Sequence, residues 1–159
     1  RSSDLQRAAG RARVGAGTVL SVADVGAVAK AGGQLIVSPN TDAAVIRATK
    51  AAGLDSYPGV FTATEAHAAI AAGADAPKFF PADLLGPKGI RAIGTILPPG
   101  MPLLAVGGVD AGNIGDYLKA GIAGFGIGTS LYKPGFAADE VARRARDMVA
   151  AFEASRSGT

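Results

Sequence analysis

The chain of 159 residues contains no cysteine and no tryptophan, and it has one histidine, His67. Without cysteine, neither a disulfide nor a thiolate metal site can form. A single histidine also argues against a zinc site, and we place His67 on the surface of a helix. No apolar run approaches the ~20 residues of a membrane span, and no signal peptide is visible. We therefore expect a cytoplasmic protein without a membrane partner, a metal or any other cofactor.

Charge is also sparse. Charged residues make up 18% of the chain against 48% hydrophobic residues, and the net charge is only +3, which favours a globular domain. Basic residues do not alternate with aromatic ones, so no nucleic-acid partner is expected. Arg143, Arg144 and Arg146 cluster near the C-terminus, and on a helix such a cluster is expected to form a solvated face.

The dominant feature of the chain is an alternation of short apolar runs with alanine-rich segments. The apolar runs predict six strands, at 13–20, 33–39, 54–59, 76–81, 102–108 and 124–130. The segments between and after them predict helices near 21–31, 41–52, 62–72, 87–97, 111–120 and 137–155. Thr62 and Glu65 form a capping-box pattern at one helix start. Gly53, Gly73 and Gly121 follow helices, where glycine can adopt the left-handed conformation that ends them.

These strands are continuous apolar runs, which favours a parallel sheet covered by helices and therefore the α/β class. We expect residues 1–159 to form one partial (β/α)8 TIM-barrel domain, with six βα units present and about the first two absent. Two observations favour this over an open doubly wound sheet. The first 13 residues resemble the end of a helix, and polar residues follow nearly every strand. A barrel gathers such strand ends around one mouth.

Lys78 is the one lysine that falls inside an apolar strand, in "DAPKFFPADLLGP". Burying an ammonium is costly, and desolvation lowers the pKa of a lysine. A neutral amine can attack a carbonyl and form a Schiff base, which permits carbon–carbon cleavage without a metal. The alternative is a lysine at a strand end whose ammonium reaches solvent. The strand alone does not decide between the two.

Two glycine-rich segments follow the last two strands. "AVGGV" (105–109) carries Gly107 and Gly108, and "GIGTS" (126–130) adds hydroxyl groups. Glycines let backbone N–H groups approach a phosphate, and barrels often bind phosphate after their last two strands. Each segment could equally be an ordinary turn. Thr18, at the end of "GAGTVL", is a candidate hydrogen-bond donor to substrate or a plain strand threonine.

Six segments together carry a family resemblance: "GAGTVL", "QLIVSPN", "YPGVFTATEA", "KFFPADLLGP", "AVGGV" and "GIGTSLYKPG". In this order they resemble the class I aldolases of 2-keto-3-deoxy-6-phosphosugar acids over residues 13–153. "QLIVSPN", "TATEA", "AVGGV" and "LYKPG" resemble the galactonate branch of that family more than the gluconate branch, which stays as the alternative. The resemblance implies a TIM barrel, a homotrimer, and cleavage of the phosphorylated keto sugar acid to pyruvate and glyceraldehyde 3-phosphate.

The same resemblance assigns roles to residues. Lys78 would be the Schiff-base lysine. The substrate-binding positions would be Thr18 for the pyruvate carboxylate, Pro39 and Phe80 for the pyruvyl pocket, and Gly107, Gly108 and Ser130 for the phosphate.

The chain departs from the family in one respect. The family's acid/base glutamate and a nearby arginine precede the "GAGT" strand, and neither has a counterpart here. We therefore expect this chain to be weakly active, because general acid–base catalysis contributes about 10²–10⁴-fold. Two rival interpretations are another phosphate-binding barrel enzyme, such as an isomerase, an epimerase or a thiamine-phosphate-synthase-like protein, and an inactive truncated product.

Overall fold

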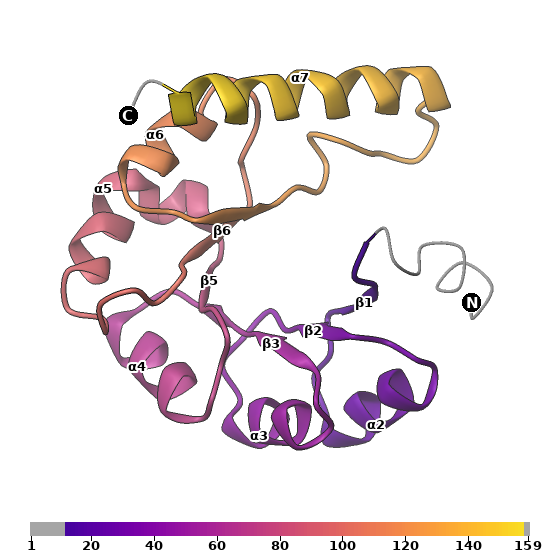
Figure 1. Cartoon of the computed structure of the whole chain (residues 1–159), viewed down its shortest axis with the longest axis vertical. Helices are drawn as coiled ribbons and strands as arrows, with labels where there is room; N and C mark the ends of the chain where they lie inside the picture. Colours follow the sequence, from indigo (N-terminus) through magenta and orange to yellow (C-terminus); the bar gives the residue numbers. More distant parts are fainter. Residues whose placement is uncertain (1–11, 158–159) are drawn as a thin grey trace. The chain divides into compact units, whose positions relative to one another are not determined.

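The computed structural model describes residues 12–157 and divides into two compact units (Figure 1). Among the described residues, the first unit comprises 12–78 and 97–101, and the second comprises 79–96 and 102–157. The expectation that the first 13 residues end a helix falls almost entirely on residues 1–11, which lie outside the described part. Within residues 12–157, no helix combines the length and hydropathy of a membrane span.

The first unit alternates strands and helices as the sequence predicts. Its elements are β1 (Gly15–Gly17), α2 (Val22–Lys30), β2 (Leu35–Val37), α3 (Ala43–Ala51), β3 (Asp55–Tyr57), β4 (Gly59–Val60) and α4 (Ala63–Ala71). Strands β1, β2 and β3 pair in parallel in that order. Helices α2 and α3 lie on the same side of this sheet (Figure 1). The buried side chains between them include Val19, Val25, Ile36, Val45 and Leu54.

Local signals in the sequence set the helix boundaries of this unit. The capping box at Thr62 and Glu65 is confirmed, because each side chain accepts a hydrogen bond from the other residue's backbone N–H. Gly53 and Gly73 have φ values of 72° and 102°, as expected for glycines that end helices.

The strand expected at 54–59 is interrupted in the structure. Asp55–Tyr57 forms β3 and Gly59–Val60 forms β4, with Pro58 between them. Proline has no N–H to donate to a ladder, so the strand breaks there. A Cβ atom on Gly59 would lie 2.0 Å from the carbonyl oxygen of Pro39. Only glycine therefore fits where β4 passes the end of β2.

The boundary between the units lies inside β5 (Lys78–Phe79). The second unit continues with α5 (Ala82–Gly94), β6 (Leu104–Val106), α6 (Ile114–Lys119), β7 (Gly124–Gly126) and α7 (Ala138–Ser157). Strands β6 and β7 are parallel neighbours, which completes the agreement with the predicted α/β class. Gly121 ends α6 with a φ of 94°, as predicted.

The helix expected at 87–97 begins earlier, at Ala82. Gly86 has a φ of 68° inside α5, so a first turn precedes a kink and the helix resumes at Pro87. The sequence signal located only the second part, because Gly86 and Pro87 resemble a helix start.

Helix α7 is held to the rest of the second unit by aromatic side chains. Phe125 of β7 makes edge-to-face contacts with Tyr117 of α6 at 6.4 Å and with Phe152 of α7 at 6.3 Å between ring centroids. A Cβ atom on Gly115 would lie 2.9 Å from the hydroxyl of Ser155, so α6 and α7 approach closely there. These contacts fix the distal part of α7 against β7 and α6.

Candidate active site

Backbone hydrogen bonds join the ends of neighbouring strands in the first unit. The N–H of Val19 donates to Val37 at 3.4 Å, and the N–H of Ser38 donates to Tyr57 at 3.2 Å. The N–H of Lys78 donates to the carbonyl of Pro58 at 2.9 Å. Each strand end is therefore anchored to the next one. Three candidates from the sequence occupy this series of strand ends: Thr18, Pro39 and Lys78.

Lys78 is buried, with 5% of its surface exposed. Desolvation lowers the pKa of its amine from 10.5 to about 8. About a tenth of the amine is then neutral at pH 7, against less than a thousandth for an ordinary lysine. Burial argues against an ammonium that reaches solvent. Lys78 is an enclosed amine with a lowered pKa, and its role as a nucleophile stays a prediction.

The segment before Lys78 is held in place by Asp75. The carboxylate of Asp75 accepts a hydrogen bond from the N–H of Ser56 in β3 at 2.7 Å and pairs with the ammonium of Lys50 at 2.7 Å. Phe79, directly after Lys78, is fully buried. The contacts of Asp75 tie the segment before the lysine to β3 and to Lys50.

Thr18 is the one described residue other than glycine with a positive φ, at 59°. This conformation is unfavourable for a β-branched residue and is found preferentially at functional sites. The side chain is exposed, and its hydroxyl has no hydrogen-bond partner among residues 12–157. Thr18 thus has a donor available for a ligand. Pro39 is half-buried.

The second unit contains a cavity of about 880 Å³ at the ends of β6 and β7. Four of the predicted site residues line it together: Phe80, Gly107, Gly108 and Ser130. The structure therefore brings the three phosphate candidates into one cavity. Phe80, expected at the pyruvyl pocket, lies with them.

The turn after β6 presents amide N–H groups. Gly107 and Gly108 have φ values of 97° and 70°, a conformation that glycine adopts without strain. The carbonyl of Gly107 accepts from the N–H of Asp83 at 3.2 Å, and that of Gly108 accepts from the side chain of Asn113 at 2.8 Å. Within the described residues, the N–H groups of Gly107, Gly108 and Val109 make no such bond. Because the N–H of a peptide points opposite its carbonyl, this turn is a candidate anion-binding nest.

Ser130 is already engaged inside the molecule. Its hydroxyl donates to the carbonyl of Val109 at 2.8 Å. The hydroxyl proton is therefore used to tie the β7 loop to the β6 turn. What Ser130 has left for a ligand is the acceptor capacity of its oxygen.

Sequence reasoning missed the charged wall of this cavity. Lys133, Arg143 and Arg144 line it. Arg143 is exposed, as expected of a solvated arginine face, whereas Arg144 is half-buried. Arg143 and Arg144 both bind Glu140, at 2.9 and 2.6 Å. Their hydrogen bonds, that of Arg144 first, lower the pKa of Glu140. The spacing Glu140-x-x-Arg143-Arg144 was the available signal, since residues three and four apart on a helix face each other.

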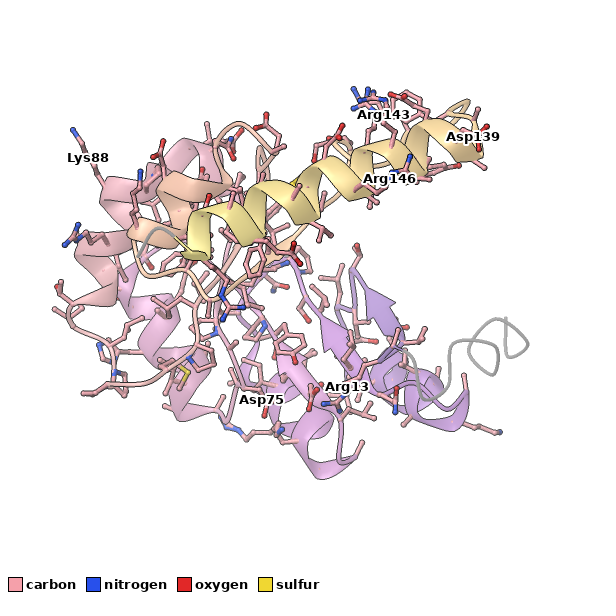
Figure 2. All side chains as sticks on the ribbon, turned by 45° about the horizontal axis from the view of Figure 1, so that its top comes forward. Arg13, Asp75, Lys88, Asp139, Arg143 and Arg146 are labelled. Carbon is pink, nitrogen blue, oxygen red and sulfur yellow. The ribbon has the colours of Figure 1, made fainter. Side chains whose placement is uncertain are left out.

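Other charged candidates stay outside this site. Arg146 of α7 is exposed and does not line the cavity (Figure 2). Lys88 is exposed and extends away from α5 (Figure 2). His67 is exposed on α4, as predicted. No group of three or more potential metal ligands occurs among the side chains that the structure describes.

These features coincide with a known family. The model of the family described as "KDPG and KHG aldolase" matches residues 4–146. The chain belongs to the KDPG and KHG aldolase family. This confirms the resemblance that the strand-end motifs indicated.

Individual members of this family are closely similar to the chain. It is 52% identical over 145 residues to the probable 2-dehydro-3-deoxy-6-phosphogalactonate aldolase of Rhizobium meliloti (strain 1021), covering 91% of this chain and 68% of the relative. It is 43% identical over 142 residues to the 2-dehydro-3-deoxy-6-phosphogalactonate aldolase of Escherichia coli (strain K12), covering 89% and 69%. A solved structure described as "Native KDPGal structure" superposes with a TM-score of 0.96 at 39% identity, covering 98% of this chain and 76% of that one.

Proposed function

We propose that this chain is a Schiff-base aldolase that cleaves 2-dehydro-3-deoxy-6-phosphogalactonate into pyruvate and glyceraldehyde 3-phosphate. The observation that carries the proposal is the buried Lys78, whose pKa is lowered to about 8 by desolvation. The names of the two relatives at 52% and 43% identity favour the galactonate substrate over the gluconate epimer.

The chemistry begins at Lys78. Its neutral amine attacks the C2 carbonyl of the substrate, and loss of water from the carbinolamine gives a protonated imine. The C3–C4 bond then breaks as the C4 hydroxyl gives up its proton to a water molecule, which later returns a proton to C3. The bonding electrons pass to C3 and the imine nitrogen, which releases glyceraldehyde 3-phosphate and leaves an enamine. Protonation at C3 and hydrolysis of the imine release pyruvate and restore the amine.

The remaining site residues fall into two groups by chemistry. The hydroxyl of Thr18 is a donor for the carboxylate of the pyruvyl group, and Pro39 with Phe80 would shape the pocket around it. Gly107, Gly108 and Ser130 would hold the phosphate. The support for the phosphate group is the nest of N–H groups and the cationic side chains of the same cavity.

Three further expectations, on the fold, the assembly and the location of the protein, accompany the reaction as proposals. The parallel strands would belong to a (β/α)8 barrel, as the TM-score of 0.96 to an aldolase structure suggests. The protein would assemble as a homotrimer and act in the cytoplasm. Analytical ultracentrifugation of the purified chain tests the homotrimer, since a trimer has three times the mass of one chain.

The experiment is borohydride trapping with pyruvate on the unaltered chain, followed by peptide mass spectrometry. We expect a reduced pyruvyl adduct on Lys78. Lys78→Ala should lose the adduct, at a cost of at least about a thousandfold in trapping rate, because the nucleophile itself is removed. Lys88→Ala is the matched control, since Lys88 is an exposed lysine, and it should leave the trapping rate unchanged.

An unlabelled Lys78 in a folded sample would refute the Schiff-base mechanism. If glyceraldehyde 3-phosphate still bound to that sample, the rival interpretation of another phosphate-binding enzyme would be favoured. The N–H nest after β6 needs no lysine and would serve either enzyme.

A further inference from the structure

Arg144 of α7 contacts three different groups of the second unit. Its Nε atom donates to the carboxylate of Glu140 at 2.6 Å, within α7. Its NH1 group donates to the backbone carbonyl of Ser130 at 3.0 Å, in the loop after β7. Its guanidinium carbon lies 4.6 Å from the ring centroid of Phe136. Three groups therefore fix one planar side chain.

Ser130 links this arginine to the turn after β6. Its carbonyl accepts from Arg144, while its hydroxyl donates to the carbonyl of Val109 at 2.8 Å. The path Glu140–Arg144–Ser130–Val109 thus consists entirely of hydrogen bonds of 3.0 Å or less. It connects α7 to both loops that carry the phosphate candidates.

The charge balance of the cavity wall argues against Arg144 as a direct ligand of an anion. Arg144 shares Glu140 with Arg143, and Arg143 also pairs with Asp147 at 2.9 Å. Two arginines are thus balanced by two carboxylates. The ammonium of Lys133, on the same wall, has no ion pair or hydrogen bond within the described residues, whereas its backbone carbonyl accepts from the N–H of Phe136 at 3.1 Å. An incoming phosphate would meet the charge of Lys133 and the N–H groups of the turn.

We propose that Arg144 is a positioning residue for phosphate binding, which holds the loop after β7 so that Ser130 keeps the N–H groups of the β6 turn directed into the cavity. This inference rests on the proposed binding of a phosphorylated substrate. Arg144 acts through Ser130 and does not touch the ligand. A planar guanidinium suits this task because one side chain must donate to two different acceptors at fixed angles.

The test compares three variants of the whole chain: Arg144→Met, Arg144→Lys and Arg146→Met. Arg146 is the matched control because it lies on the same helix, is exposed and does not line the cavity. The first readout is the dissociation constant for glyceraldehyde 3-phosphate, with glyceraldehyde and inorganic phosphate as separate probes. The second readout is the rate of borohydride trapping with pyruvate, which has no phosphate.

We expect Arg144→Met to weaken the binding of glyceraldehyde 3-phosphate and of inorganic phosphate about tenfold, the factor that one well-formed hydrogen bond supplies. Arg144→Lys should recover only part of this loss, because an ammonium keeps the charge and loses the planar fork. Arg146→Met should bind as the unaltered chain does. Trapping with pyruvate should not change in any of the three.

A further comparison separates positioning from direct contact. In a Ser130→Ala background the link to Val109 is absent, so Arg144→Met should then cost less than about twofold. A full tenfold loss in that background would mean that Arg144 meets the phosphate itself, and would overturn the inference. Equal losses in Arg144→Met and Arg146→Met would overturn it as well, as would a failure of the unaltered chain to bind either phosphate probe.

The inference and the aldolase proposal can fail separately. If pyruvate is not trapped at Lys78 but phosphate binding still depends on Arg144, the positioning role stands and the aldolase mechanism falls. If pyruvate is trapped and phosphate binding is indifferent to Arg144, the reverse holds.

Discussion

The strand end at Lys78 and the turn at Gly107 and Gly108 prepare for chemistry in opposite ways. At Lys78 a single side chain is altered by its surroundings, since burial to 5% exposure lowers the pKa of its amine to about 8. At Gly107 and Gly108 there is no side chain to alter. Their contribution is a backbone conformation, held by hydrogen bonds from Asp83 and Asn113.

The two sites destabilise the folded state in different ways. A buried amine disfavours the folded state at neutral pH, because the unfolded chain would hold its proton more tightly. A glycine turn costs backbone entropy, which the surrounding hydrogen bonds must offset. Substitution of Lys78 should therefore change the stability of the chain and its pH dependence. Substitution in the glycine turn should change the affinity for a phosphorylated ligand.

The largest effect we expect is on stability at the lysine. Lys78→Met should raise the free energy of unfolding at pH 7 by up to roughly 3 kcal/mol, because a folded pKa of about 8 against 10.5 corresponds to about that amount. The difference should be constant below pH 8 and shrink between pH 8 and pH 10.5, where the unaltered chain gains stability as pH rises. Urea unfolding at several pH values measures it. Lys88→Met, with the same loss of charge at an exposed site, should show no such trend.

The pH dependence of trapping comes next. In the proposed mechanism only the neutral amine of Lys78 attacks pyruvate, so the trapping rate should rise with pH and level off above a midpoint of about 8. Between the plateau and pH 6 the rate should fall about a hundredfold, since each pH unit below the pKa costs about tenfold in neutral amine. A midpoint near the pKa of an ordinary lysine would show that burial does not activate the amine of Lys78. The contrast between Lys78 and the glycine turn would then be lost.

Gly108→Ala tests the backbone side. A Cβ atom there would lie 2.4 Å from the Cβ of Asp83, and the residue has a φ of 70°. We expect glyceraldehyde 3-phosphate to bind at least about tenfold more weakly, because the turn must shift to relieve the contact. Gly121→Ala is the control, since Gly121 has a φ of 94° with open space around its Cβ position. It should lose similar stability through strain and keep its phosphate affinity, as calorimetry and a binding titration would show.

The smallest effect should come from Thr18, where strain and function meet. Thr18→Gly removes a β-branched residue from a φ of 59° and should stabilise the chain by about 1 kcal/mol. Loss of the hydroxyl should at the same time weaken trapping by pyruvate about fivefold, the share of one hydrogen bond. Thr18→Ser keeps the hydroxyl and should trap normally. A Thr18→Gly variant that gained stability and trapped at the full rate would leave the strain of Thr18 without a functional reason.

Predictability differed between the two sites for a physical reason. Lys78 stood out because an ammonium contradicts an apolar strand, and that contradiction is visible in a few residues. The helix ends at Thr62, Gly53 and Gly73 were equally predictable, since capping depends on neighbours along the chain. The early start of α5 was not, because Gly86 and Pro87 mask the turn before them.

The arginines of α7 show the limit of such reasoning. Arg143, Arg144 and Arg146 look alike in the sequence, and all three were expected in solvent. The structure separates them by what lies opposite each one. Arg144 meets a carbonyl 14 residues away in the chain, whereas Arg146 stays exposed. The spacing from Glu140 distinguishes Arg144 from Arg146 locally, but no local pattern shows that Arg144 reaches the carbonyl of Ser130.

By itself, the sequence determined the α/β alternation, the helix ends at Thr62, Gly53, Gly73 and Gly121, the family and the candidate nucleophile, because each depends on residues close together in the chain or on motifs in a fixed order. The tertiary structure alone decided how far Lys78 is desolvated, which groups donate to the carbonyls of Gly107 and Gly108, and which arginine of α7 reaches the loop of Ser130. Burial and hydrogen-bond partners depend on segments distant in sequence, and only their packing sets the local dielectric and the direction of each N–H group.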